Sequence, residues 1–245
     1  MSVLIVTGTD TEVGKTVVTA AIAAIAVEHG HRVAVIKPAQ TGVSDGEPGD
    51  VDVVRGLAGE ITTRELRRYP DPLAPDTAAR RSGIEYVTPA EVAEAAADLN
   101  ASHDLVLVEG AGGLLVRLDD KGGSMADVAW SLAAPVVVVA RAGLGTLNAT
   151  ALTAEVATRR GLNVAGVVVG SWPAEPGLAE ICNVTDLPVV AGAPLLGLLD
   201  EHIGELSPGG FLAAAERGLS PWFGGRFDPE LFAAGLPNPD LGTPL

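Results

Sequence analysis

The chain has 245 residues, 47% of them hydrophobic, and a formal net charge of −15. This length suits one large α/β domain or two small ones with a sizeable core, and the acidic balance argues against nucleic acid or an anionic membrane as the main partner. No apolar run reaches the roughly 18 residues of a membrane span, and no basic leader precedes the first strand, so we expect neither a span nor a signal peptide. A single cysteine, Cys182, allows no internal disulfide and favours the cytoplasm.

Short apolar strands alternate with helical segments along the chain. Continuous apolar strands without alternation indicate a parallel sheet covered on both faces. We therefore predict a single doubly wound α/β domain over residues 1–225, with a mostly parallel sheet and helices on both faces. Residues 226–245 are rich in Pro and Gly and are predicted to form a loosely ordered tail. The predicted strands are 2–6, 32–36, 104–108, 135–140 and 163–169, and the predicted helices include one reaching residue 28, one opening near Asp50 and a crossover helix at 149–160.

A phosphate-binding turn follows the first strand, in the sequence GTDTEVGKT at residues 8–16. N–H groups at a helix N-terminus carry partial positive charge, so such a turn cradles phosphate oxygens. Gly14 lets the backbone approach closely, Lys15 reaches the β- and γ-phosphates, and the Thr16 hydroxyl can ligate Mg²⁺. Five residues, not the usual four, separate Gly8 from Gly14. The chain has only three lysines, and keeping one here supports a nucleotide-binding function.

Charged residues end two other predicted strands at the same edge of the sheet. Glu109 ends the run VLVE before a glycine loop, and Lys37 ends VAVIK. Ligands of open α/β sheets bind at these strand ends, so Glu109 is predicted to hold Mg²⁺ and Lys37 to serve the reaction. The alternatives are a buried structural carboxylate and a solvated lysine. Asp50 and Asp52 open a helix, where either serves Mg²⁺ or caps the helix.

Four segments together resemble the dethiobiotin synthetases, in that family's order and spacing. They are GTDTEVGKT, KPAQTG, LVEGAGGLLV and GLGTLNATALTAE, within residues 1–200. The resemblance implies an ATP-dependent ligase of biotin synthesis. Such an enzyme converts 7,8-diaminopelargonic acid, CO₂ and ATP into dethiobiotin, ADP and phosphate, usually as a homodimer.

The resemblance also implies roles for individual residues. It makes Lys37 catalytic together with Lys15, and it gives Thr16, Asp50 and Glu109 the Mg²⁺ positions, with Asp52 as the alternative to Asp50. The nucleotide phosphates would be lined by Glu12, Val13, Gly14, Lys15, Thr16 and Val17, with Asp50 nearby, and by a second loop of Glu109, Gly110, Ala111 and Gly112. The diamine would contact Thr11, Lys37 and Thr41, and its carboxylate would contact Thr146, Leu147 and Asn148 of the neighbouring subunit. The alternative for Asn148 is a helix cap.

The expected nucleobase site departs from the family pattern. Many members carry Asn-Asp after the strand at 163–169, whereas this chain has Gly170-Ser171 followed by Trp172. Recognition of the base edge by these two positions is therefore expected to be weaker. Trp172 either stacks on the base or packs as an ordinary buried aromatic.

Three rival interpretations fit the sequence less well. A partition-type ATPase of the deviant P-loop class would carry a further lysine where this chain has Asp10. An inactive nucleotide-binding domain would not be expected to retain Lys37, Thr41 and Glu109. An amidotransferase-linked amide ligase would need a second domain with a cysteine nucleophile.

Overall fold

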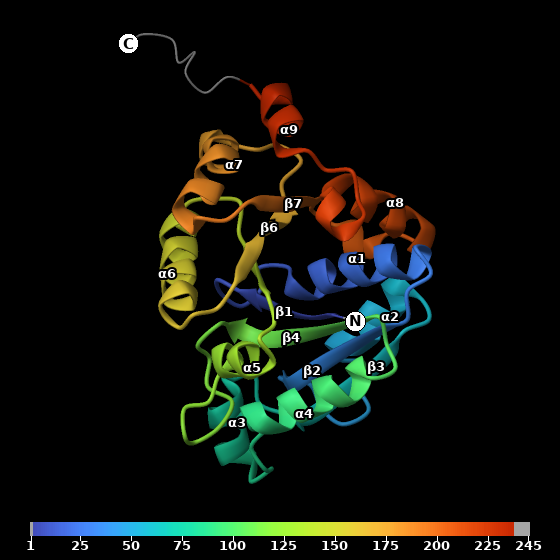
Figure 1. Ribbon diagram of the computed structural model, residues 1–245, viewed down its shortest axis with the longest axis vertical. Helices are drawn as coiled ribbons and strands as arrows, with labels where there is room; N and C mark the ends of the chain where they lie inside the picture. The colour runs from blue at the N-terminus through green and yellow to red at the C-terminus, as the bar shows by residue number, and fades with distance from the viewer. Residues whose placement is uncertain (1, 238–245) are drawn as a thin grey trace.

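A parallel sheet forms the centre of the computed structural model, which describes residues 2–237 (Figure 1). Within these residues the sheet has seven strands in the order β3-β2-β4-β1-β5-β6-β7, and the paired neighbours are parallel. The strands are β1 (Ser2–Gly8), β2 (Val33–Thr41), β3 (Thr62–Tyr69), β4 (Leu105–Gly113), β5 (Val136–Ala140), β6 (Val164–Trp172) and β7 (Leu195–Asp200).

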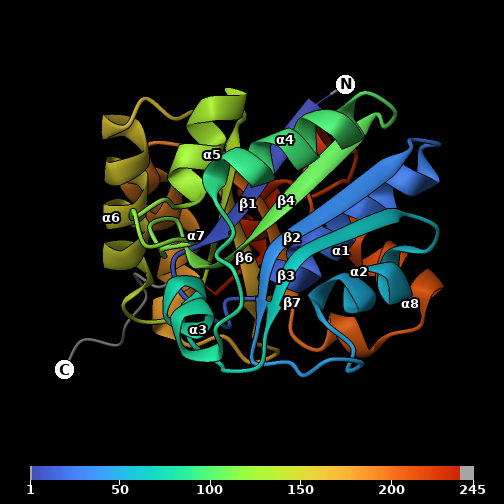
Figure 2. The same ribbon diagram turned by 90° about the horizontal axis from the view of Figure 1, so that it is seen from below.

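Helices cover both faces of this sheet (Figures 1 and 2). Helices α1, α2 and α8 pack together on one face, whereas α4, α5, α6 and α7 follow one another over the other face. Among residues 2–237, no helix is long and apolar enough to cross a membrane. The helices are α1 (Lys15–Glu28), α2 (Asp50–Ala58), α3 (Pro75–Ser82), α4 (Pro89–Asn100), α5 (Met125–Leu132), α6 (Thr146–Arg159), α7 (Leu178–Ala191), α8 (Pro208–Gly218) and α9 (Pro229–Gly235), with 3₁₀ turns η1 (Ile203–Glu205) and η2 (Pro221–Phe223).

The doubly wound architecture and the five predicted strands are confirmed, while β3 and β7 were not predicted. The sequence of β3, TTRELRRY, is charged because β3 is an edge strand, half-exposed along most of its length. Its polar side chains hide the apolar pattern that marks a strand. The sequence of β7, LLGLLD, is apolar but lacks β-branched residues, so its type could not be decided from composition.

The segment after Arg226 differs from the expected loose tail as far as residue 237. Helix α9 forms there, capped by the Asp228 carboxylate, which accepts hydrogen bonds from the N–H groups of Glu230 and Leu231. Phe232 meets Trp172 edge to face with ring centroids 5.5 Å apart. Trp172 is 6% exposed and therefore packs as a buried aromatic. Residues 238–245 lie outside the described residues.

Candidate active site

The turn after β1 forms a loop around the start of α1. The Lys15 side chain folds back over this loop and donates a hydrogen bond from Nζ to the Asp10 carbonyl at 2.8 Å. Gly14 precedes α1 with φ of 89°, a left-handed conformation that glycine adopts without strain. Since no side chain of the described residues caps this helix, the N–H groups of its first turn are available to an anion.

Two glycines bring β6 against the phosphate loop. A Cβ on Gly14 would lie 2.5 Å from the Gly170 carbonyl oxygen, and a Cβ on Gly170 would lie 2.1 Å from the Val13 oxygen. Neither position has room for a side chain. Gly170 therefore packs against the phosphate loop and does not line the cavity described below. Ser171 is exposed.

A buried lysine and two carboxylates meet beside the loop. Lys37 is 4% exposed, and its Nζ lies 2.8 Å from Glu109 Oε1 and 2.5 Å from Asp50 Oδ2. The Thr16 hydroxyl donates to the same Glu109 oxygen at 2.9 Å. Strands β2 and β4 and the first turns of α1 and α2 thus bring together the residues predicted from separate motifs. Lys37 and Glu109 were predicted to end their strands, but β2 continues to Thr41 and β4 to Gly113.

The geometry distinguishes Asp50 from Asp52. Asp50 reaches Lys37, whereas Asp52 accepts a hydrogen bond from the Gly49 N–H at 2.9 Å and pairs with Arg55. Asp52 therefore caps α2, and Asp50 is the carboxylate at the site.

Burial and neighbouring charges act differently on the two lysines. Burial, together with the nearby Lys37 charge, lowers the pKa of Lys15 to about 8. Burial alone would also lower the pKa of Lys37, but the carboxylates of Glu109 and Asp50 outweigh it and raise that pKa. Lys37 therefore stays charged, whereas an anionic ligand would stabilise the charged form of Lys15.

The residues around Lys37 fit a divalent cation. The Lys37 ammonium already occupies a place between two carboxylates, and the second oxygen of Glu109, Oε2, is buried with no hydrogen-bond partner in residues 2–237. Carboxylate and hydroxyl oxygens are the ligands that Mg²⁺ prefers, usually completed by waters and substrate phosphates. In the described part of the chain no cluster of three or more His, Cys, Asp or Glu could hold a metal, so such an ion would depend on the phosphates as well.

A cavity of about 940 Å³ contains most of the predicted site. Its lining includes the predicted residues Thr11, Glu12, Gly14, Lys15, Thr16, Val17, Lys37, Thr41, Asp50, Glu109, Ala111 and Gly112. Val13 and Gly110 are buried beside it and do not line it. Thr146, Leu147 and Asn148 begin α6 and also lie outside the cavity.

One wall of the cavity was missed by sequence reasoning. The wall is apolar and is made by Val43, Pro72, Leu73, Ala74, Pro75 and Val116. Most of it follows β3 in the sequence YPDPLAP. Because β3 itself was not recognised, the position of this segment at a strand end could not be inferred.

Fold and site together define a nucleotide-binding protein of the P-loop class. A family model described as AAA domain matches residues 2–202. A Streptomyces avermitilis protein named ATP-dependent dethiobiotin synthetase BioD is 62% identical over 234 residues, covering 96% of this chain and 98% of that protein. A Saccharopolyspora erythraea protein of the same name is 64% identical over 227 residues, covering 93% and 99%. The chain belongs to the family of ATP-dependent dethiobiotin synthetases, which are ligases.

Solved structures with the same fold include cell-division ATPases. The septum site-determining protein MinD from Pyrococcus horikoshii OT3, complexed with Mg-ADP, has a TM-score of 0.54 at 19% identity, covering 88% of this chain and 87% of that chain. At this identity the likeness shows the fold alone. The relatives above support the synthetase over the partition-type ATPase.

Proposed function

We propose that the protein carboxylates 7,8-diaminopelargonic acid with CO₂ and closes the ring to dethiobiotin, at the expense of ATP. The observation that carries this proposal is a single cavity with two halves. One half holds the phosphate loop, two lysines and two carboxylates, as phosphoryl transfer requires. The other half is apolar and suits an alkane chain. The names of the relatives support the same reaction.

The proposed chemistry needs no protein nucleophile. One amine of the diamine captures CO₂ as a carbamate, whose oxygen attacks the γ-phosphorus of ATP and releases ADP. The second amine then attacks the carbonyl carbon of the mixed anhydride, expels phosphate and closes the cyclic urea. The protein's contribution is positioning and stabilisation of negative charge.

Each cation of the site has a place in this scheme. Lys15 and the N–H groups of the first turn of α1 hold the ATP phosphates, and Lys37 stabilises the charge that develops on the transferred phosphoryl group. Thr11 and Thr41 contact the diamine. Thr16, Asp50 and Glu109 would hold Mg²⁺, which neutralises phosphate charge when bound.

We also propose a homodimer in which each site takes residues from both subunits. Thr146, Leu147 and Asn148 lie outside the cavity of their own chain, and the start of α6 offers N–H groups to a carboxylate. Leu144, just before α6, is 92% exposed and Leu152 on α6 is 56% exposed, so apolar side chains are available there to a partner subunit. A twofold axis, the commonest oligomer symmetry, would bring α6 of one subunit to the cavity of the other.

Two further features of the protein are inferred from the same data. The nucleotide is ATP by default, but Gly170 and Ser171 offer little side chain to read a base edge. We propose the cytoplasm as the location, because the reaction consumes ATP and bicarbonate.

An oxygen tracer tests the proposed reaction. Purified protein is incubated with the diamine, ¹⁸O-labelled bicarbonate, Mg²⁺ and ATP, and both products are analysed by mass spectrometry. Dethiobiotin should form, and phosphate should carry one ¹⁸O because the carbamate oxygen leaves with it. Dethiobiotin formed with unlabelled phosphate would contradict the carbamate route, and absence of dethiobiotin would contradict the function.

A further inference from the structure

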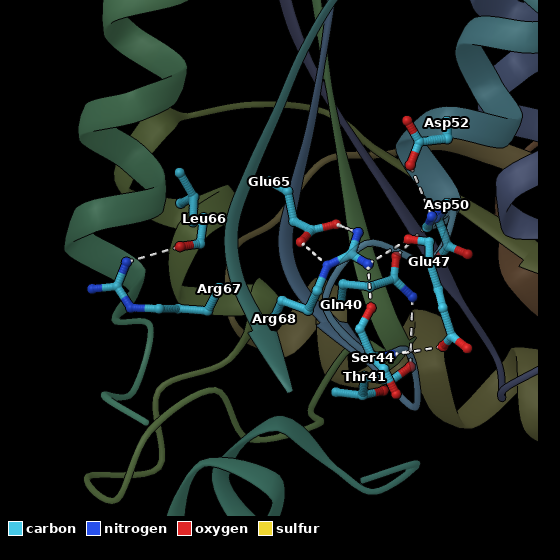
Figure 3. A network of polar contacts seen from close by, with 11 residues as sticks. Gln40, Thr41, Ser44, Glu47, Asp50, Asp52, Glu65, Leu66, Arg67 and Arg68 are labelled. Carbon is cyan, nitrogen blue, oxygen red and sulfur yellow. Dashed lines mark hydrogen bonds and ion pairs between the residues drawn. The ribbon is translucent and has the colours of Figure 1, made fainter. Parts of the chain in front are cut away.

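The loop between β2 and α2 delivers Asp50 to the site without regular secondary structure of its own. Residues 44–48 are all exposed, and α2 begins only at Asp50. The Asp50 carboxylate nevertheless reaches Lys37. The side chains that hold this loop come from β2 and β3 (Figure 3).

Gln40 on β2 contacts the first residue of α2. Its side chain is 4% exposed, and its Oε1 accepts a hydrogen bond from the Asp50 N–H at 2.8 Å. The first N–H groups of a helix have no partner within the helix, and Gly49 before them has no side chain to cap them. Gln40 therefore supplies the acceptor from a neighbouring strand and fixes the backbone from which the Asp50 carboxylate extends.

Arg68 on β3 holds the preceding part of the loop. It lies opposite Gln40 in the register of β2 and β3, and its Nη1 donates to the carbonyl oxygens of Ser44 at 3.0 Å and Glu47 at 2.6 Å. Glu65 orients the guanidinium through two hydrogen bonds of 2.7 and 2.8 Å. Both side chains of this pair are less than one-fifth exposed, at 18% for Arg68 and 17% for Glu65.

The three side chains converge on Gly49. A Cβ there would lie 2.9 Å from Arg68 Nη2, 2.9 Å from Gln40 Oε1 and 3.1 Å from Glu65 Oε2. The backbone of residue 49 is thus enclosed by polar atoms immediately before Asp50. The loop is exposed at its tip and held tightly at its end.

We infer that Gln40, Glu65 and Arg68 form a clamp that positions the Asp50 carboxylate for a divalent cation, with Gln40 as the central positioning residue. The inference rests on the proposed function, because that function gives Asp50 its ion. The clamp acts through the backbone of Asp50, and within residues 2–237 none of its three side chains hydrogen-bonds to Lys15 or to the phosphate loop. Loss of the clamp should therefore weaken metal binding and leave nucleotide binding nearly unchanged.

The test compares variants of the clamp with a matched control on the same strand. Gln40→Met removes the acceptor, and Arg68→Met removes the loop contacts. Arg67→Met is the control, because Arg67 donates to Glu91 of α4 and lies on the other side of β3 from Arg68 (Figure 3). Mn²⁺ affinity is measured by electron paramagnetic resonance with a non-hydrolysable ATP analogue, and affinity for the analogue alone is measured in a chelator.

Gln40→Met should bind Mn²⁺ about fivefold more weakly, the loss expected for one hydrogen bond, and Arg68→Met, which removes two loop contacts, should lose at least as much. Their metal-free nucleotide affinity should stay within about twofold of the wild type, and Arg67→Met should match the wild type in both. Gln40→Glu keeps an oxygen acceptor and should restore Mn²⁺ binding. Thermal melts establish that each variant is folded, and if Gln40→Met is not, Arg68→Met decides alone.

Unchanged Mn²⁺ affinity in the folded clamp variants would overturn the inference, as would an equal loss in Arg67→Met. An equal loss of metal-free nucleotide affinity would also overturn it, since that result indicates general disorder. The readout is binding and not product formation. A protein that makes no dethiobiotin would refute the proposed function while leaving the clamp result valid.

Discussion

Replacing Lys37 with methionine tests the site most informatively, because it keeps most of the length of the side chain and removes the charge. Glu109 is 1% exposed and, among residues 2–237, would retain only the Thr16 hydroxyl as a hydrogen-bond donor. Leaving one member of a buried ion pair without its partner costs about 3–5 kcal/mol. We expect the lower end, because Asp50 is one-third exposed and water can solvate it. A loss of about 3 kcal/mol lowers Tm by roughly 6–12 °C in a chain of this size.

The same variant should lose activity by a different route. If Lys37 stabilises the transferred phosphoryl group, kcat falls by about 10²–10³. Calorimetry measures the loss of stability apart from the loss of kcat. With Mg·ADP present, Mg²⁺ should recover part of the lost stability by taking the place of the Lys37 ammonium between the two carboxylates. The double variant Lys37→Met/Glu109→Gln should regain stability but not activity. A single variant with Tm within 2 °C and kcat within about threefold of the wild type would refute this reasoning.

Three other predictions follow from the same geometry. The pKa of Lys15 is about 8 in the free protein, and bound phosphate favours its charged form, so metal-free ATP affinity should fall about tenfold from pH 7 to pH 9. Isothermal titration calorimetry would show this, and a Lys15→Gln variant with the same slope would assign the effect to another group. Values of kcat/KM for GTP, CTP and UTP should lie within about tenfold of that for ATP, or 1.4 kcal/mol, and a preference above a hundredfold would show that the base is read elsewhere. Asn148→Asp should raise the KM for the diamine, and mixing it with Lys37→Ala should restore some activity through mixed dimers; no recovery, with mixed dimers verified by mass, would contradict the shared site.

Much of the architecture and most of the cavity could be predicted from the sequence. The motif around Lys15 and the placement of Lys37 and Glu109 on parallel strands depend on local patterns, which bring these residues to one site. The ends of the two strands were predicted too early, because β2 and β4 continue past Lys37 and Glu109. The apolar wall around Leu73 could not be predicted, because it follows an edge strand whose charged residues conceal its type.

Long-range contacts account for the remaining differences. Gly170 was interpreted as a missing base reader, yet it has no room for a side chain because the phosphate loop lies against it. The choice between Asp50 and Asp52 depended on which face of α2 meets β2, which two neighbouring aspartates do not reveal. Helix α9 packs through the contact of Phe232 with Trp172, which lies more than fifty residues earlier in the chain.

The central claim is that this phosphate-binding cavity uses ATP to carboxylate the diamine and does not merely hydrolyse the nucleotide. The most direct measurement quantifies ADP and dethiobiotin together, omitting the diamine and bicarbonate in turn. The proposed function predicts one ADP for each dethiobiotin, and little ADP when either substrate is missing. ATP hydrolysis at an undiminished rate without diamine, and no product of the mass of dethiobiotin when both are present, would contradict it.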